Sequence, residues 1–377
     1  MYIGGRVQID FHHGVTYICA RLAGFEPADA EVIAYSAQYV DDATNGGEIS
    51  FDNGALYSRI ASAHKMLDYR NMDDLAAHRV WLPFHFLPGN NGEPDIANPS
   101  AYGTAEYISR CICRPDSHVA RRMMFDAMRH QDRPYALQRL GIASHVYVDT
   151  WAHQGFVGFQ HEVNVVKDMV ADDEKHRMSF ADRIEDFFRE NWDTAKSELV
   201  GGVLPLGHGA ALSYPDRPYL LWSYTNGLGE RIERNNPRDF HAAAAHLYSM
   251  FRRYLDYGRE GEGALESEYL LPDAFGLIER GLKEIDDEDA DVRHAKWLQK
   301  IAAGEFGFNE RVAYIAKGEG SWKHAALATI ASDRDENPYV FTEGFRSSNW
   351  KKFHDALQAH RLYVLNDLLP EFGLIAA

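Results

Sequence analysis

Histidine and aspartate recur at four-residue intervals in the segment Gly141-Ile-Ala-Ser-His145-Val-Tyr-Val-Asp149-Thr-Trp-Ala-His153. Each four-residue step turns an α-helix about 40° beyond a full turn, so the three polar side chains would lie within roughly 80° of one face. Two neutral imidazoles and a carboxylate suit zinc or a similar divalent ion. The alternative is a helix with a polar solvent face, but the small and apolar neighbours would then leave a buried aspartate unexplained.

Two further groups of the same residue types lie near the N-terminus. In Asp10-Phe-His12-His13, an acid and a histidine two apart can both reach one ion, and His12 is the better ligand candidate. Asp41 and Asp42 end an apolar helical segment, where negative charge opposes the helix dipole and calls for a compensating cation. The alternatives are a turn with exposed histidines and a solvated helix end.

Two more histidines lie in segments that suit a ligand site. His85 follows Trp81-Leu-Pro-Phe, and it is either a packed core histidine or a ligand in a rigid loop. His208 stands between glycines, which allow a ligand to approach the backbone closely. Asp216 follows a proline, and the simplest interpretation is that it starts a turn.

The composition limits the classes of protein to which the chain can belong. The 377 residues are 45% hydrophobic and 25% charged, which is typical of a globular chain with a large core. The net charge of −17 argues against a long nucleic acid as a partner. Three cysteines are too few for a disulfide framework. Because there is no leader-like or membrane-spanning apolar run, we expect a cytoplasmic protein, with leaderless export or injection as an effector as the alternative.

Helical spacing of apolar residues dominates, and alternating strand patterns are scarce. We therefore expect an all-α multi-helix bundle with long functional loops and a metal cluster inside it. The expected domains are a metal-binding catalytic domain over 1–258 and a helical extension over 259–377 that packs on it and supplies no ligand, or one continuous domain. The spacing predicts helices over residues 27–40, 55–67, 117–129, 134–153, 180–199, 238–257, 274–285 and 351–368.

The order of these motifs resembles a known superfamily. An early His12, Asp41 at a helix end, His85 in an aromatic loop and then Gly-x-x-Ser-His-x-x-x-Asp-x-x-x-His are similar to the all-α zinc-dependent phospholipase C and single-strand nuclease superfamily. The likeness covers roughly residues 10–220, and it is closest to the phospholipase branch and a related uncharacterised bacterial family. An N-terminal tryptophan ligand has no counterpart here, and the spacing from Asp149 to His153 is shorter than in the secreted enzymes.

The resemblance implies a helical bundle that holds one to three zinc ions, or another divalent metal, with Asp149 as a bridging ligand. It makes seven residues the metal-ligand candidates, namely His12, Asp41, His85, His145, Asp149, His153 and His208.

The expected function is a metal-dependent phosphodiester hydrolase, most similar to phospholipase C, that uses a metal-activated water. Asp10, Asp41 and Asp42 are the candidates for a general base or for orienting that water. The substrate would be a phospholipid or another small phosphodiester, with transient contact to a membrane surface. The alternatives are a single-strand nuclease, a nucleotide phosphohydrolase with the same metals, or a non-catalytic metal-stabilised binding or effector module. Serine and cysteine catalysis have no recognisable motif.

Overall fold

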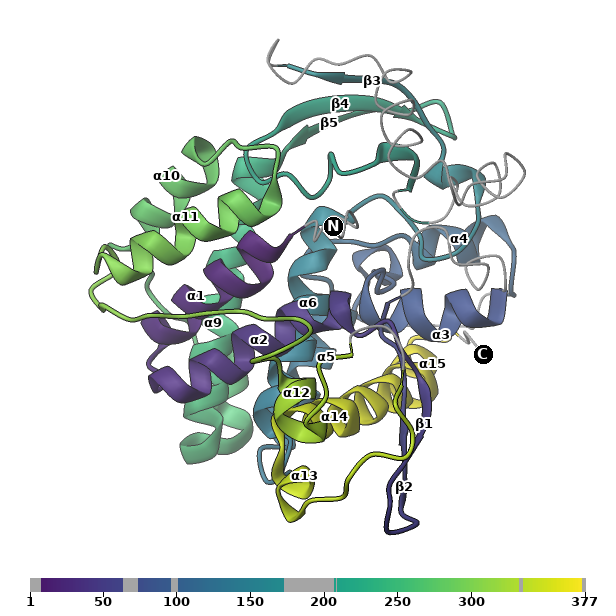
Figure 1. Cartoon of the computed structure of the whole chain (residues 1–377). Coiled ribbons are helices and arrows are strands. Elements are labelled where there is room, and N and C mark those ends of the chain that lie inside the picture. The colour runs from purple at the N-terminus through teal and green to yellow at the C-terminus, as the bar shows by residue number, and fades with distance from the viewer. Residues whose placement is uncertain are drawn as a thin grey trace.

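The computed structural model describes most of the chain, namely residues 8–63, 74–95, 101–172, 207, 209–331 and 335–374. These residues form a mainly helical structure, which confirms the dominant helical spacing (Figure 1). The expected all-α bundle is confirmed in its mainly helical character, and two small antiparallel sheets are present in addition. The expected helix over residues 180–199 lies outside the described residues.

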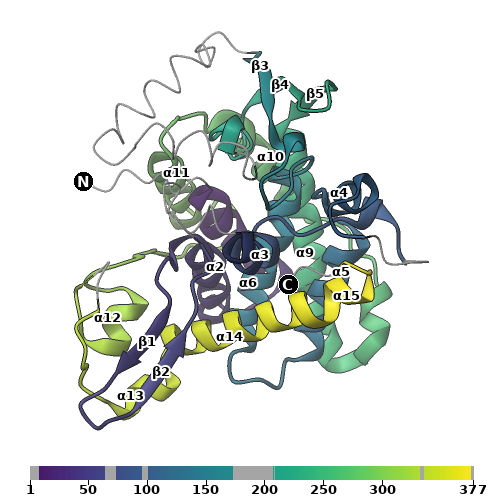
Figure 2. The ribbon, with the colours of Figure 1, turned by 90° about the vertical axis from the view of Figure 1, so that its right-hand side faces the viewer.

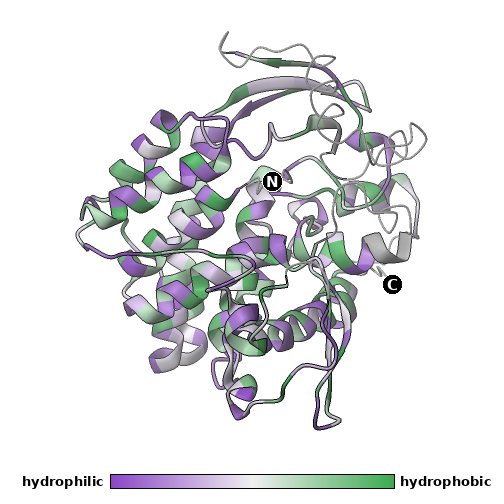
Figure 3. Ribbon diagram, in the orientation of Figure 1, coloured by the Kyte–Doolittle hydropathy of each residue, from purple (hydrophilic) through white to green (hydrophobic). Residues whose placement is uncertain are grey.

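Five helices make the centre of the molecule. They bury their apolar faces against one another in a single large hydrophobic cluster, and in Figure 1 they occupy the left and the middle of the view. Figure 3 shows polar and apolar residues alternating along such helices, as amphipathic helices require. Their bounds agree with the predictions to within a few residues where a prediction was made; they are α1 (Thr16–Ala23), α2 (Pro27–Asp42), α5 (His118–Arg129), α6 (Ala136–Ala152) and α9 (Asn236–Glu260).

Gly141 sets the spacing between α2 and α6. A Cβ atom built on Gly141 would lie 2.4 Å from the Ile33 carbonyl oxygen and 2.6 Å from the Ser36 Cβ. Both contacts are shorter than packed atoms allow, so only glycine permits this approach. Since α2 carries Asp41 and α6 carries His145 and Asp149, the close contact brings the candidate ligands of two helices together.

We expect Gly141→Ala to lower the free energy of unfolding by about 1–3 kcal/mol, because the added methyl group overpacks the α2–α6 contact. Gly276 offers a matched control, because it lies in a helix and a Cβ atom added to it would meet no described atom within 4 Å. Gly276→Ala should be neutral or stabilising by up to about 1 kcal/mol. Chemical denaturation measures both, and equal effects of the two substitutions would contradict the packing argument.

The C-terminal third packs over the central helices. The helices α10 (Phe275–Glu284) and α11 (Ala290–Ala302) lie against α9 and against the π-helix η1 (Asp10–Val15). Apolar residues of α10 and α11 belong to the same hydrophobic cluster as those of the central helices. The division at residue 258 stays a prediction.

The remaining C-terminal elements pack in two places. Apolar residues within 322–331 and 335–357 form a second core with α2 and with the first sheet (Figure 2), whereas apolar residues within 364–374 belong to the large hydrophobic cluster. The π-helix η8 continues α14 directly, so the predicted helix over residues 351–368 is confirmed. These elements are α12 (Trp322–Leu327), α13 (Glu343–Ser347), α14 (Asn349–Tyr363), η8 (Val364–Leu368) and α15 (Leu369–Glu371).

The first sheet lies where a helix was expected. Strand β2 (Leu56–Arg59) pairs antiparallel with β1 (Gly47–Ser50), so the predicted helix over residues 55–67 is wrong at these positions. The turn between the strands contains Asn53-Gly54, and Gly54 has a φ of +81°, which favours glycine. The hairpin packs on the C-terminal helices through Phe51, Tyr57 and their neighbours.

The second sheet has three strands in the order β3 (Val166–Ala171), β4 (Leu221–Asn226) and β5 (Arg231–Asn235). Its inner face packs on aromatic side chains around Phe156 and Tyr214. The other described elements are α3 (Asp74–Phe84), α4 (Ala105–Cys111) and the 3₁₀ turns η3 (Asn90–Gly92), η4 (Glu162–Asn164), η6 (Gly209–Ala211) and η7 (Gly261–Glu266). Among the described residues, no helix has the length and apolarity needed to cross a bilayer.

Candidate metal centre

Helix α6 brings three of the candidate ligands to one face. His145 and Asp149 are buried within the helix, and His153 is its C-cap residue. The His153 amide donates to the Asp149 carbonyl at 2.8 Å, so the helical path continues to the third residue. His145 Nε2 lies 3.2 Å from Asp149 Oδ2, and His153 Nδ1 lies 3.6 Å from the same oxygen. The predicted shared face is therefore present.

His85 joins this group from the end of α3. His85 Nδ1 lies 3.2 Å from His145 Nε2 and 3.3 Å from Asp149 Oδ2. The three atoms form a nearly equilateral triangle, because the remaining edge, between His145 and Asp149, is 3.2 Å. Bonds of roughly 2.0–2.1 Å to a tetrahedral zinc ion put two ligand atoms about 3.3 Å apart. The triangle thus has the dimensions of one face of a zinc coordination tetrahedron.

Backbone carbonyls fix the orientation of two of the imidazoles. His85 Nε2 lies 3.0 Å from the Ser62 carbonyl oxygen, and His153 Nδ1 lies 2.8 Å from the His85 carbonyl oxygen. A carbonyl can only accept a hydrogen bond, so each of these nitrogens must carry a proton. In the neutral rings, His85 Nδ1 and His153 Nε2 then present lone pairs, as in metal-binding histidines whose other nitrogen is held by a carbonyl.

These lone pairs face carboxylate oxygens. His85 Nδ1 faces Asp149, and His153 Nε2 lies 3.6 Å from Asp216 Oδ1. A lone pair directed at a carboxylate is repulsive unless a cation lies between them, either a proton or a metal ion. The donor set is therefore suited to a divalent ion.

Asp41 approaches the triangle from the end of α2. Asp41 Oδ1 lies 3.8 Å from His145 Nε2 and 3.9 Å from His85 Nδ1. Its side chain is 29% exposed, whereas those of His85, His145 and Asp149 are at most 5% exposed. Asp41 thus lies at the open side of the group.

Asp42 points to a different neighbour. Its Oδ2 accepts a hydrogen bond from the Tyr314 hydroxyl at 2.6 Å. Tyr314 comes from the C-terminal third, so part of the compensation for this helix-end charge is a hydrogen bond and not a metal.

His12 faces the second carboxylate oxygen of Asp149. Its Nε2 is 3.1 Å from Asp149 Oδ1, and its ring stacks on that of His145 with 4.0 Å between the centroids. His12 belongs to the π-helix η1, a type of helix that often occurs at functional sites. The two oxygens of Asp149 therefore face different histidines, which is the arrangement that a bridging carboxylate would have.

Asp10 and His13 face α11 instead. Asp10 Oδ2 accepts from Arg293 Nε at 2.8 Å, and both side chains are buried. This pairing does not fit the predicted role of Asp10 as a general base. The alternative of a turn with exposed histidines does not hold for His13, because it is buried, and its Nδ1 lies 2.8 Å from His294 Nε2.

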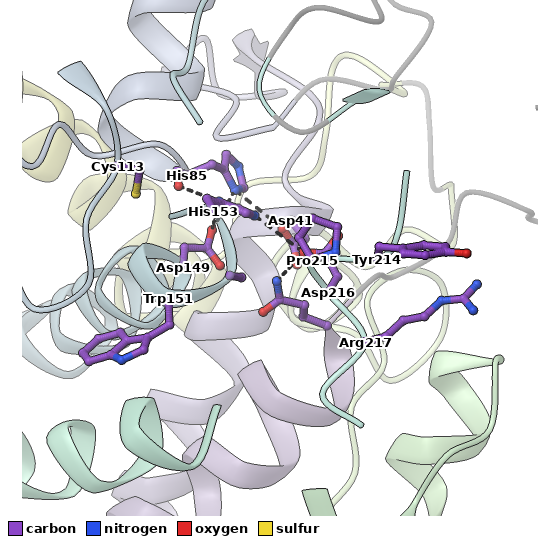
Figure 4. A network of polar contacts seen from close by, with 12 residues as sticks. Asp41, His85, Cys113, Asp149, Trp151, His153, Tyr214, Pro215, Asp216 and Arg217 are labelled. Atoms are coloured by element: carbon purple, nitrogen blue, oxygen red, sulfur yellow. Dashed lines mark hydrogen bonds and ion pairs between the residues drawn. The ribbon is translucent and has the colours of Figure 1, made fainter. Parts of the chain in front are cut away.

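Asp216 is the residue of the site that the sequence did not reveal. It was interpreted as the start of a turn, yet it is 2% exposed and faces His153 Nε2 (Figure 4). Gln8 Nε2 donates to Asp216 Oδ1 at 2.5 Å and holds the carboxylate in place. The loop before β4 has no spacing relation to α6, so only the fold brings Asp216 to the centre.

The charges of the site suit metal binding. Burial alone would raise the pKa of Asp149, but the His145 and His153 imidazoles outweigh burial and hold this pKa well below its usual range. Burial and the neighbouring His12 lower the pKa of His145, which keeps it neutral. Burial would also lower the pKa of His153, but Asp149 and Asp216 raise it to about 9, so at neutral pH this ring carries a proton that a bound metal ion would displace. Desolvation raises the pKa of Asp41 to about 6, although His145 and His85 act against it.

His208, the last of the predicted ligands, lies outside the described residues. Of the other six, two overlapping groups have ligand atoms within 4.8 Å of one another: His12 with Asp41 and His145, and His85 with His145 and Asp149. The three cysteines are buried, and burial raises the pKa of each thiol. This environment is typical of unreactive cysteines.

Comparison with known proteins gives one match. The model of a family described as "Family of unknown function (DUF6765)" matches residues 7–368. No curated protein and no solved structure matches the chain. The matched range includes the described candidate ligands as well as Arg293 and His294 of α11. Because the match takes in nearly the whole sequence, this chain belongs to the DUF6765 family.

Proposed function

We propose that this protein is a metal-dependent phosphodiester hydrolase of phospholipase C type. The observation that carries the proposal is the buried triangle of His85 Nδ1, His145 Nε2 and Asp149 Oδ2, with Asp41 at its open side. The edges of 3.2–3.3 Å match a tetrahedral ion with histidine and carboxylate ligands. A triangle with one open side is typical of a catalytic metal site, which leaves a position for substrate or water.

The candidate ligands have distinct roles in this proposal. His85, His145 and Asp149 would hold one ion, and the overlapping group of His12, Asp41 and His145 is the candidate for a second ion. His153 and Asp216 lie beside these ligands, with 3.6 Å between His153 Nε2 and Asp216 Oδ1. When bound, such an ion supplies Lewis acidity and makes water a nucleophile near neutral pH. Buried side chains around the ligands exclude bulk water and so strengthen these electrostatic interactions.

Asp41 is the proposed proton acceptor. It reaches solvent and lies within 4 Å of two ligand nitrogens, so a water that attacks a substrate at the open side would meet it first. A pKa of about 6 leaves Asp41 mostly ionised at neutral pH, yet basic enough to accept a proton. Asp42 is held by Tyr314 and Asp10 by Arg293, so we assign them positioning and structural roles.

The substrate class follows from charge and from the resemblance to the phospholipase branch. A net charge of −17 disfavours long nucleic acid and leaves small phosphodiesters and phospholipid head groups. The competing functions are a single-strand nuclease, which would cleave single-stranded DNA, and a non-catalytic metal-stabilised module, which would turn over no diester.

We expect the purified protein to contain one to three zinc ions, or another divalent metal, per chain by elemental analysis. It should hydrolyse p-nitrophenyl phosphorylcholine, lose this activity with 1,10-phenanthroline and recover it when zinc is added back. Release of diacylglycerol from phosphatidylcholine vesicles would support the phospholipase assignment, whereas cleavage of single-stranded DNA would support the nuclease. Bound metal without turnover of any diester would indicate the non-catalytic module. Absence of metal together with chelator-insensitive activity would overturn the proposal.

A further inference from the structure

A small cavity lies beside the C-terminal end of α2, next to the candidate metal centre. The empty space between its walls is about 300 Å³ when the open solvent at its mouth is counted with it. We call it the cationic pocket, and it is lined by Tyr39, Asp42, Ala43, Thr44, Asn45, Arg59, Lys317, Lys323, Trp350 and His354. Its walls thus come from α2, β2 and the C-terminal third.

Positive charge gathers in the cationic pocket. Arg59 is 3% exposed and Lys323 is 6% exposed, and both approach the same carboxylate, that of Asp335. Arg59 Nη2 lies 2.5 Å from Asp335 Oδ2, and Lys323 Nζ lies 3.7 Å from Asp335 Oδ1. Lys317 brings a third positive charge to the same wall. Cations held close together away from bulk water are costly unless anions accompany them, so this wall favours an anionic occupant.

Several polar atoms of the pocket wall lack a partner within the described part of the chain. Arg59 Nε, His354 Nδ1 and Thr44 Oγ1 are buried, and no described residue forms a hydrogen bond with them. Arg59 and His354 are both more than nine-tenths buried. An unsatisfied buried donor costs about 1–3 kcal/mol, so the two donors of this set, Arg59 Nε and the Thr44 hydroxyl, indicate a polar ligand beside one cavity. The guanidinium and the hydroxyl are donors that suit an oxyanion.

The pocket and the metal centre share the end of α2, although no described candidate ligand lines the pocket. Asp42 lines the pocket, and the preceding residue, Asp41, is the candidate ligand whose side chain is 29% exposed. If a substrate reaches the metal centre past Asp41, the part of the substrate next to its diester group would lie near the cationic pocket.

We propose that the cationic pocket binds a second anionic group of the substrate, a tetrahedral oxyanion such as a phosphate, next to the diester that is cleaved. The role in substrate binding rests on the proposed function. The binding of an oxyanion by the pocket does not depend on that function. The competing explanation is that the three cations only neutralise Asp42 and Asp335. That explanation leaves Arg59 Nε and Thr44 Oγ1 without partners among the described residues.

Sulfate is the probe for the pocket, because it has the charge and shape of a phosphate group and is a weak ligand for divalent metals. Titration calorimetry on the metal-loaded protein at low ionic strength should detect sulfate binding. We expect Lys317→Gln/Lys323→Gln to weaken it by about tenfold or more, because charge-assisted hydrogen bonds are lost. Lys296→Gln is the control, since Lys296 is exposed and pairs with Asp287 on the α11 side. If the double variant melts early, Lys317→Gln alone, at a half-buried position, replaces it.

Kinetic measurements with two substrates test whether the pocket binds a second phosphate of the substrate. Thymidine 3′-phosphate 5′-(p-nitrophenyl phosphate) carries a second phosphate, and bis(p-nitrophenyl) phosphate does not. We expect the double variant to raise KM for the first substrate only. No sulfate binding by the wild type, or equal affinity in the wild type and the double variant, would overturn the pocket assignment. Sulfate binding that depends on the lysines, without hydrolysis of either diester, would keep the pocket and reject the proposed function.

Discussion

Replacing Arg293 with methionine should lower the free energy of unfolding by about 3–5 kcal/mol. The Arg293 guanidinium is buried and donates through Nε to Asp10 Oδ2 at 2.8 Å. Its Nη1 donates to the carbonyls of Asp287 and Glu288 at 2.9 Å, so one side chain ties η1 to the start of α11. Methionine keeps the apolar length but leaves the buried Asp10 carboxylate without its counter-charge.

Urea denaturation measures the loss in the free energy of unfolding, and an exposed ion pair serves as the control. Lys283→Met removes the surface partner of Glu279 and should change the free energy of unfolding by less than about 1 kcal/mol. Adding Asp10→Asn to Arg293→Met should recover part of the loss, because the uncompensated charge is then gone. An Arg293→Met protein as stable as the Lys283→Met protein would show that the buried pair is not needed.

The same variants test the role of Asp10. If Asp10 only pairs with Arg293, Asp10→Asn should lower stability and leave the bound metal per chain unchanged. If Asp10 were a ligand or the general base, metal content or activity would fall at a temperature where the protein is fully folded. The measurement separates the structural role seen in the geometry from the catalytic role expected from the Asp10-Phe-His12 motif.

Local spacing was enough to predict the parts of the site that lie on one element. His145, Asp149 and His153 are four residues apart, and helix geometry alone puts them on one face. The end of α2 at Asp42 and the helix after Ser117 also follow from local residues, since Ser117 caps α5 by accepting from the Ala120 amide.

Contacts between distant elements were not predictable from such spacing. Asp216 lies beside His153, which is 63 residues away in the sequence, and Arg293 binds Asp10, which is 283 residues away. Nothing in the sequence around Asp216 or Arg293 marks a partner so far away, and only the packing of α11 and of the loop before β4 creates these pairs. The C-terminal third was expected to cover the bundle, but it also supplies the groups that hold Asp10 and Asp42.

The first sheet was missed for a different reason. Apolar residues after Ala55 have a spacing that also suits a helix, and short strands are easily mistaken for helices. The Asn53-Gly54 pair is a strong hairpin signal that the helical interpretation ignored. Strand β2 then forms because its partner strand and the C-terminal helices bury one side of the hairpin, which is tertiary information.

The largest functional effect should come from Asp149→Asn. Asp149 is 1% exposed, with Oδ1 3.1 Å from His12 Nε2 and Oδ2 within 3.3 Å of the His85 and His145 nitrogens. Asparagine keeps the size of the side chain and removes the negative charge at the centre of the group. We expect metal affinity and activity to fall on the order of 10- to 100-fold or more, since even residues behind the ligands have effects of this size. The melting temperature should fall as well, because metal binding is linked to folding.

Asp126→Asn is the matched control for this substitution. Asp126 is also a buried aspartate against α6, but it accepts from Arg139 Nη2 at 2.9 Å, and none of the described histidines of the metal centre lies beside it. Its replacement should lower stability and leave metal content unchanged. Bound metal per chain and the melting temperature, each with and without chelator, distinguish the two sites. If Asp149→Asn keeps wild-type metal content and chelator sensitivity, Asp149 is a structural buried charge like Asp126, and the metal centre with the hydrolase built on it is wrong.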